Sequence, residues 1–198
     1  MQRPDNDGYG VIEDPYCYPG TTLLRNLPGL EDAAALAAFE AASTAQRADE
    51  PLPRGRLSAS HYSAIHHHLF QDVYPWAGRL RTVRLSKDGS AFCYPEHIAR
   101  EMRGLFGQLR RDAFLRDLPR DGFARKAARF LGTLNAIHAF REGNGRTQTT
   151  FLALLAARAG HPLALGQLVP ERFLAAMIAS FGGNEAPLTA EIRRLISG

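Results

Sequence analysis

Apolar residues recur along most of the chain at the three- and four-residue spacing of amphipathic helices. The alanine-rich residues 31–48 show this spacing simply, with Leu36 and Phe39 three positions apart. Two prolines and a glycine within residues 49–57 must end that helix. The same periodicity predicts further helices over residues 60–72, 95–115, 121–138, 144–159 and 170–181, and a last one after Pro187.

One stretch departs from helical spacing. Apolar and polar residues nearly alternate over residues 80–86, which is the pattern of a strand with one buried face. A turn sequence, Lys-Asp-Gly-Ser, follows at 87–90, and residues 91–94 supply the returning strand. The chain is therefore predicted to be all-α with a single β-hairpin. The helices over 121–138 and 144–159 carry apolar residues on several sides and are expected at the centre of the bundle.

Length and composition narrow the class of protein. A chain of 198 residues suits one domain, so we expect a single domain over residues 1–198 with an irregular N-terminal segment at 1–15. Its two cysteines exclude a disulfide scaffold. No window approaches the ~18–20 apolar residues of a membrane span, so no membrane partner is expected. The first ten residues lack the apolar core of a secretory signal, and a cytoplasmic location is expected.

The charge balance is mildly basic, with 24 Lys and Arg against 20 Asp and Glu. The densest basic stretch, residues 110–126, is interrupted by three aspartates. We interpret it as a solvated helical surface, because DNA binding favours a continuous basic stripe. No direct contact with nucleic acid is expected.

The candidate chemistry lies between the two central helices, in the sequence HAFREGNGR of residues 138–146. Gly143 and Gly145 flank the start of the second helix and permit close approach of the backbone to a ligand. The unpaired N–H groups and the dipole of a helix N-terminus favour an anion, above all phosphate. Arg146, in the first turn, can add a charge-assisted bond to a second phosphate.

Two further residues of this segment can be given chemical roles. Glu142 would repel a phosphate, so we interpret it as the ligand of a Mg²⁺ ion that bridges phosphates. His138 is the candidate general base, which takes a proton from a hydroxyl. Phe140 is expected to face the core and anchor the loop. The residues alone leave one alternative open, a helix-capping turn with a core histidine.

These nine residues resemble the active-site motif of Fic domains, His-x-Phe-x-(Asp/Glu)-Gly-Asn-Gly-Arg. Tyr18-Pro19-Gly20-Thr21 resembles the family's N-terminal segment, and residues 72–78 with Arg81 resemble its central signature. Phe92-Cys93 resembles the edge of its flap hairpin. The resemblance runs from about residue 14 to the end of the chain. It implies a Fic-type helical bundle in which the predicted hairpin is the flap.

The resemblance also implies an activity, the transfer of AMP from ATP to a Ser, Thr or Tyr hydroxyl of a target protein. His138 would then be catalytic, and the hairpin 80–94 would dock a target segment as an added strand. Lys87, at the hairpin turn, is a further candidate for contact with the nucleotide, although a solvated turn accounts for it equally well. The implied cofactor-binding residues are Glu142 (through Mg²⁺), Gly143, Asn144, Gly145 and Arg146.

Two positions depart from the family pattern. Ala139 stands where the family often has proline, which loosens the loop but removes no chemical group. Thr149 stands where many active members carry a second arginine. Losing that charge-assisted contact could weaken ATP binding by ~1.5–3 kcal/mol. The alternative is therefore a catalytically weak or dead Fic-like module that binds a nucleotide or a partner.

Many Fic proteins carry an inhibitory helix with the pattern (Ser/Thr)-x-x-x-Glu-(Gly/Asn). No glutamate of this sequence has Ser or Thr four residues before it. By resemblance, the chain is similar to toxin-like members that a separate small antitoxin protein inhibits by supplying the helix. Such toxins modify the ATPase subunits of DNA gyrase and topoisomerase IV, which makes these subunits candidate targets.

A cluster of histidines at His61 and 66–68 invites comparison with a metal site. The helical i, i+4 pair is not formed from His61, because Ile65 occupies that position. No set of cysteines or carboxylates completes a zinc pattern. A packing or surface role is therefore expected for these histidines.

Overall fold

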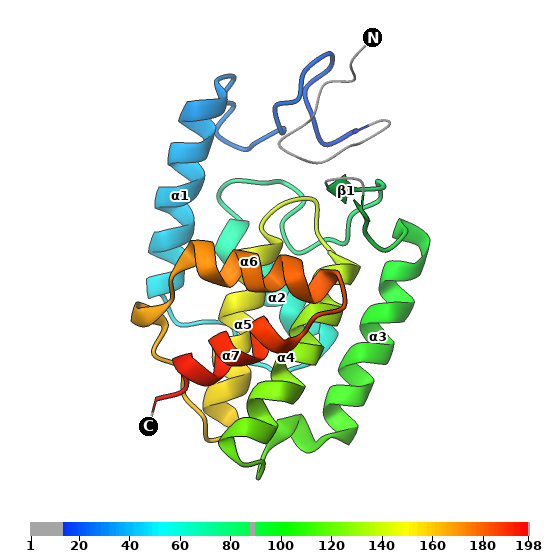
Figure 1. The fold of residues 1–198 in the computed structure, drawn as a ribbon. Helices are drawn as coiled ribbons and strands as arrows, with labels where there is room; N and C mark the ends of the chain where they lie inside the picture. Colours follow the sequence, from blue (N-terminus) through cyan, green and yellow to red (C-terminus); the bar gives the residue numbers. More distant parts are fainter. Residues whose placement is uncertain (1–13, 88–89, 198) are drawn as a thin grey trace. The chain divides into compact units, whose positions relative to one another are not determined.

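The computed structural model describes residues 14–87 and 90–197 and contains, within them, seven α-helices and one short hairpin (Figure 1). This confirms the predicted all-α class with a single hairpin. The predicted irregular segment 1–15 lies outside the described residues except for its last two positions. The helices are α1 (Ala33–Asp49), α2 (Ala59–Phe70), α3 (Pro95–Arg111), α4 (Arg120–Ile137), α5 (Asn144–Arg158), α6 (Pro170–Phe181) and α7 (Ala186–Leu195).

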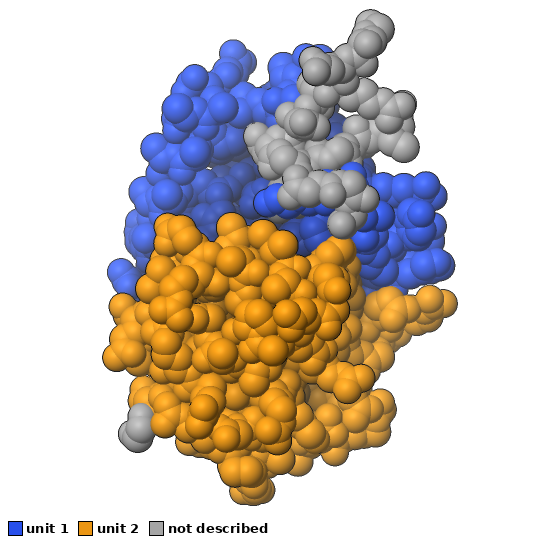
Figure 2. Space-filling view, viewed as in Figure 1, with its two compact units in different colours: residues 1–56, 60–99, 138–147 blue, residues 57–59, 100–137, 148–198 orange. Residues whose placement is uncertain are grey.

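The chain forms two compact units, coloured separately in Figure 2. Unit 1 comprises residues 1–56, 60–99 and 138–147, and unit 2 comprises residues 57–59, 100–137 and 148–198. Their boundaries fall within α3 and close to both ends of the segment that joins α4 to α5. That the whole chain is a single domain stays a prediction. Among the described residues, no helix is both long enough and apolar enough to cross a bilayer.

The core of unit 2 is apolar and is built by α4, α6 and α7, which pack against one another. Phe123 and Leu134 on α4 and Leu188 and Ile192 on α7 are fully buried. Gly132 lets α4 and α6 approach closely, because a Cβ at this position would lie 2.3 Å from the Ser180 Oγ. Within unit 2, α4 is therefore the central helix that its many apolar positions predicted.

Unit 1 holds α1, α2, the hairpin and the segment 138–147. The side chain of Asp32 caps α1 by accepting a hydrogen bond of 2.7 Å from the Ala35 N–H. Helix α2 buries an apolar and aromatic stripe that includes Tyr62, Ile65 and Phe70. Trp76 is buried and stacks on Tyr74 with a centroid separation of 4.4 Å. Unit 1 thus surrounds the candidate segment with aromatic rings.

The hairpin is much shorter than the sequence predicted. Its strands are β1 (Ser86–Lys87) and β2 (Ser90–Ala91), with Ser86 opposite Ala91 and Lys87 opposite Ser90. Residues 80–84 do not extend the ladder of hydrogen bonds. The Arg81 guanidinium instead bonds the carbonyl of Val83, on the arm before β1, and the carbonyl of Cys93, on the arm after β2. A charged side chain has taken acceptors that longer strands would have used.

The third predicted helix also ends early. Helix α3 stops at Arg111 instead of 115, and a 3₁₀ turn, η1 (Ala113–Leu115), follows. The three residues of this turn have φ values of 53°, 56° and 60°. A left-handed backbone cannot continue a right-handed helix, so the apolar pattern alone placed the end too late.

Candidate functional site

The segment with the candidate chemistry joins the end of α4 at Ile137 to the start of α5 at Asn144. Helical periodicity placed both ends within one residue. His138 is the first residue after α4 and Arg146 lies in the first turn of α5. The structure therefore places the predicted base before the loop and the predicted phosphate-binding residues at a helix N-terminus.

His138 adopts a left-handed backbone, with a φ of 48°, and is 6% exposed. This conformation is uncommon for a residue other than glycine. The Phe92 ring, from the hairpin, stacks on the imidazole with a centroid separation of 3.9 Å and an interplanar angle of 19°. The Arg81 Nε donates a hydrogen bond of 2.7 Å to the His138 carbonyl. Both the ring and the backbone of His138 are therefore held by residues of the hairpin region.

Phe140 anchors the loop in the core of unit 1, as predicted. It is fully buried, and its ring lies 5.3 Å from Tyr62 and 3.8 Å from His66 between centroids. The Asn144 amide closes the loop, since it accepts from the Phe140 N–H at 3.0 Å and donates to the Phe140 carbonyl at 2.8 Å. This gives the Asn144 side chain a structural task that the sequence did not reveal. Its part in phosphate binding stays a prediction.

Gly143 must be glycine for two reasons. Its φ is +79°, and a Cβ at this position would lie 2.3 Å from the Phe70 Cζ. Gly145 differs, because its φ is not in the left-handed region and a Cβ would meet nothing within 4 Å. Open space next to the first turn of α5 is what a ligand at this helix N-terminus would require.

Glu142 is half-buried, and its Oε1 accepts a hydrogen bond of 2.8 Å from the Gly143 N–H. Burial raises the pKa of Glu142, the Gly143 N–H opposes this shift, and the nearby Glu40 carboxylate adds to it. A cation beside Glu142 would relieve the cost of a buried negative charge. The chemistry of this position thus fits its prediction as a ligand of Mg²⁺.

His66 fixes the Glu142 backbone. Its Nδ1 accepts from the Gly78 N–H at 2.8 Å, so the proton must lie on Nε2, which donates to the Glu142 carbonyl at 3.0 Å. Burial lowers the pKa of His66 to about 4, which keeps the ring neutral at pH 7. His61, His67 and His68 likewise bond to backbone carbonyls, and His67 is exposed, in keeping with the packing or surface role expected for the cluster.

Arg146 is held by a network that the sequence did not predict. Its guanidinium forms an ion pair with Glu40 on α1 and donates to the Thr44 Oγ1 at 3.1 Å. Glu40 also accepts a hydrogen bond from the Tyr74 hydroxyl, and the guanidinium lies over the Phe70 ring. The Arg146 side chain is still 40% exposed. It is therefore oriented from one side while a substantial part of it faces solvent.

Arg141, the variable position between Phe140 and Glu142, has a structural role. Its fully buried Nε donates to the Asp14 Oδ2 at 2.7 Å, and the Asp14 side chain is 7% exposed. This ion pair ties the segment around Asp14 to the candidate loop. The family motif leaves this position variable, so the sequence gives no sign of a role for Arg141. The contact with Asp14 is seen only in the folded structure.

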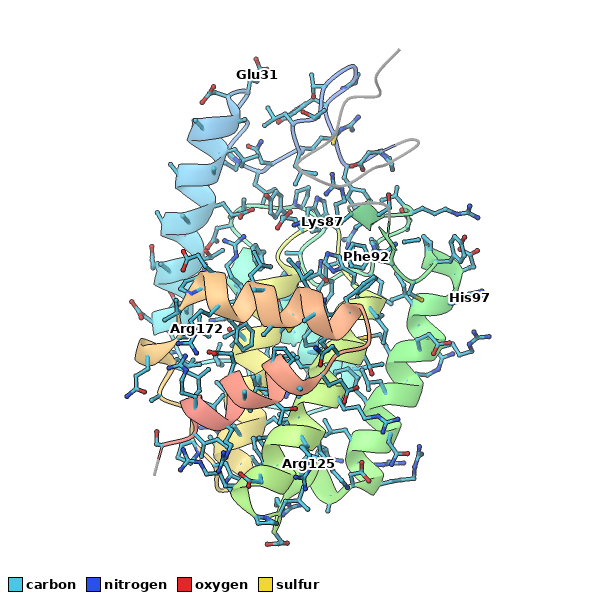
Figure 3. The ribbon with its side chains drawn as sticks, viewed as in Figure 1. Glu31, Lys87, Phe92, His97, Arg125 and Arg172 are labelled. Carbon is cyan, nitrogen blue, oxygen red and sulfur yellow. The ribbon has the colours of Figure 1, made fainter. Side chains whose placement is uncertain are left out.

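Lys87, the predicted nucleotide contact on the hairpin, lies on β1 opposite Ser90 (Figure 3). Phe92, five residues further along the chain, is the hairpin residue that stacks on His138. Its place beside the family-like Cys93 was a usable signal, but no pattern in the sequence indicated that its ring would contact His138. The role of Lys87 stays a prediction.

Taken together, the loop presents an imidazole, a helix N-terminus with open space, a half-buried carboxylate and an oriented guanidinium. Such a set can bind the phosphates of a nucleotide and take a proton from a hydroxyl.

Comparisons with known proteins agree with this chemistry. The model of the Fic/DOC family matches residues 56–156. A Sinorhizobium fredii protein named probable protein adenylyltransferase y4lH is 51% identical over 189 residues, which are 95% of this chain and 98% of that protein. Protein adenylyltransferase VbhT of Bartonella schoenbuchensis is 38% identical, over 94% of this chain and 40% of that protein.

Solved structures give the same result. BepC of Bartonella tribocorum with bound AMPPNP is 27% identical, has a TM-score of 0.81, and matches 92% of this chain and 96% of its own. The N-terminal Fic domain of a VirB-translocated effector of Bartonella quintana with bound ADP is 28% identical, with a TM-score of 0.82 and coverages of 92% and 94%.

Proposed function

Because this chain belongs to the Fic/DOC family, we propose that it transfers AMP from ATP to a Ser, Thr or Tyr hydroxyl of a target protein. It is an enzyme of the nucleotidyltransferase class, a protein adenylyltransferase. The observation that carries the proposal is the position of His138 before a glycine-flanked helix N-terminus that also presents Arg146. ATP as the substrate is supported by the AMPPNP and ADP bound to similar Fic domains.

In this reaction the target hydroxyl oxygen forms a bond to the α-phosphorus. The bond between the α-phosphorus and the oxygen that bridges it to the β-phosphate breaks. His138 takes the hydroxyl proton, and pyrophosphate leaves. The Gly143 N–H donates to Glu142, so the N–H groups of Asn144 and Gly145 that follow it bind phosphate oxygens, while Arg146 stabilises the charge on the leaving group. These residues act by positioning and electrostatics, which supply most of the catalysis in phosphoryl chemistry. The target segment docks along the hairpin 80–94.

Mg²⁺ is proposed as the metal, with Glu142 as the protein residue that holds it. Magnesium commonly uses one or two carboxylates and completes its shell with substrate oxygens and water. The half-buried Glu142, with its raised pKa and the Glu40 carboxylate nearby, suits such an ion. The bound ion would neutralise phosphate charge.

We propose that the chain acts in the cytoplasm as the toxin of a toxin–antitoxin pair. The support is the lack of an inhibitory (Ser/Thr)-x-x-x-Glu pattern in the 198 residues, together with the family resemblance. A small antitoxin protein would supply the inhibitory helix. The ATPase subunits of DNA gyrase and topoisomerase IV are the proposed targets.

The activity can be tested by incubating the protein with Mg²⁺, ATP labelled at the α-phosphate and a bacterial lysate. We expect labelled protein bands, reduced about 10²- to 10⁴-fold in His138→Ala because the general base is lost. His97→Ala is the matched control, since His97 is an exposed histidine at the start of α3 (Figure 3). Equal labelling by the wild type and His138→Ala would contradict the proposal.

Thr149 favours a second candidate, a Fic-like module that binds nucleotide without turnover. Thr149 is a half-buried residue of α5, three positions after Arg146. This candidate predicts ATP binding by calorimetry, no labelled product from the wild type, and no labelling by Thr149→Arg. Labelling by the wild-type chain contradicts it.

A further inference from the structure

Arg81 is a buried arginine that the proposed reaction does not use directly. It lies at the start of the arm that leads into β1 and is 2% exposed. Burial lowers the pKa of Arg81 to about 10, which leaves the guanidinium charged at pH 7. A buried charge is stable only where well-placed acceptors replace its water shell. The arrangement of those acceptors indicates what the residue does.

The Arg81 side chain joins three separate parts of unit 1. Its Nε donates to the His138 carbonyl at 2.7 Å, its Nη1 to the Val83 carbonyl at 2.5 Å, and its Nη2 to the Cys93 carbonyl at 2.6 Å. Val83 lies on the arm before β1 and Cys93 on the arm after β2. One planar guanidinium therefore bonds both arms of the hairpin and the candidate base. The three donors of a lysine cannot reproduce this planar fork.

The Arg81 backbone strengthens the same connection, because its N–H donates to the Ala139 carbonyl at 2.9 Å. Residue 81 thus bonds two successive carbonyls of the loop, at the point where His138 holds its left-handed φ of 48°. A non-glycine residue keeps such a conformation only where its surroundings enforce it. The two bonds from Arg81 to the His138 and Ala139 carbonyls hold the backbone in this conformation.

The hairpin holds the imidazole as well as the backbone. Phe92, which stacks on the His138 ring, precedes Cys93, whose carbonyl Arg81 binds. The Phe92 N–H in turn donates to the Leu85 carbonyl at 3.1 Å, on the opposite arm. The hairpin and Arg81, which are hydrogen-bonded to each other, therefore set both the plane of the His138 imidazole and the position of the His138 carbonyl.

We propose that Arg81 is a positioning residue that locks His138 to the hairpin, so that a hydroxyl docked on the hairpin meets the imidazole in a fixed geometry. This inference rests on the proposed function, because it assigns the reacting hydroxyl to a segment bound at the hairpin. Arg81 touches neither ATP nor the hydroxyl and acts through His138 alone.

The test uses Arg81→Lys, which keeps the charge and loses the fork, and Arg81→Gln. Arg79→Lys and Arg79→Gln are the matched controls, since Arg79 is an exposed arginine two residues away. In the lysate assay we expect the transfer rate at saturating ATP to fall about 10- to 100-fold in the Arg81 variants, as for small misplacements of catalytic groups. The KM for ATP should change less than about two-fold, because no uniform binding is lost. The Arg79 variants should match the wild type.

A second measurement separates this inference from the activity itself. In protein labelled with ¹³C and ¹⁵N at histidine, the His138 ring protons are assigned by their loss in His138→Ala. Their shifts report the stacked Phe92 ring and should move in the Arg81 variants but not in the Arg79 variants. If the wild type transfers no AMP, the proposed function fails while this readout still tests the lock. Unmoved His138 signals would overturn the lock, and so would an active wild type whose transfer rate is matched by Arg81→Lys.

A measurement on the wild-type protein tests the inference even if the Arg81 variants do not fold. Hydrogen exchange of the Arg81 Nε–H should be slow and should follow that of the Arg81 backbone N–H, because both donate to loop carbonyls and open only when residue 81 separates from the loop. An Nε–H that exchanges much faster than the Arg81 backbone N–H would overturn the inference.

Discussion

The segment 138–147 in unit 1, which comprises the candidate loop and the first turn of α5, and the helices α4, α6 and α7 in unit 2 both have buried residues, but different forces hold them. The loop is fixed by polar side chains that bond its backbone, namely Arg81, His66 and Asn144, and by the Arg141–Asp14 ion pair. The helices are fixed by apolar side chains such as Leu134 and Ile192. Hydrogen bonds have direction and apolar burial does not. Directional bonds are used where a backbone must keep an unusual shape, and apolar packing is used where regular helices need only be brought together.

The largest effect should come from the buried ion pair of the loop. Asp14→Asn leaves the buried Arg141 without its carboxylate and should lower the free energy of unfolding by about 3–5 kcal/mol. Urea unfolding of the purified protein measures this. Arg100→Gln breaks an exposed pair with Glu101 and should change stability by about 1 kcal/mol or less. Equal losses in the two variants would show that the loop does not depend on its buried polar contacts.

A somewhat smaller loss is expected from the apolar core. Leu134→Ala removes a fully buried side chain from α4 and should cost about 2–5 kcal/mol through lost burial and the cavity that remains. Leu174 on α6 is 55% exposed, so Leu174→Ala should lie within about 0.5 kcal/mol of the wild type. Thermal or urea unfolding tests both. A Leu134→Ala protein as stable as Leu174→Ala would contradict the apolar account of unit 2.

The smallest effect should come from a polar cluster in unit 2, formed by Glu191, Arg172 and Arg194, which lies beside the apolar packing of that unit. Burial tends to raise the pKa of Glu191, but hydrogen bonds from Arg194 and Arg172 outweigh it and hold the pKa below its ordinary value of 4.5. A depressed carboxyl pKa stabilises the folded state above that value, and the contribution is lost as the pH falls through and below it.

Glu191→Gln should therefore flatten the acid loss of stability below about pH 4.5, by about 1 kcal/mol or less. Urea unfolding between pH 3 and 7 compares the variant with the wild type. Superimposable pH profiles would mean that Glu191 adds nothing and that unit 2 rests on apolar packing alone.

The helices could be predicted because their cause is local. Leu36 and its neighbours repeat at the helical period, and α1 follows within two residues of the predicted limits. The loop sequence likewise located the candidate site, because Gly143 and the residues around it carry a dense local motif. Local patterns of this kind can be recognised in a single sequence without knowledge of the fold.

The features that the sequence did not predict depend on polar side-chain contacts, some between residues far apart in the chain and some across a single loop. The hairpin is short because Arg81 takes acceptors on both arms, and Glu40 on the alanine-rich α1 gave no sign that it would pair with Arg146. The Asn144 amide bonds the Phe140 backbone, a structural task that the sequence did not reveal. Each of these contacts joins a polar side chain to a group whose position only the folded backbone defines.

The bond between Arg141 and Asp14 spans 127 positions of the chain. At about 5–20 residues per second, a ribosome takes roughly 6–25 s to make the intervening segment. During that interval Asp14 has emerged and its arginine does not yet exist. The reacting centre is therefore completed late in synthesis, and a nascent chain interrupted before residue 141 lacks this buried ion pair.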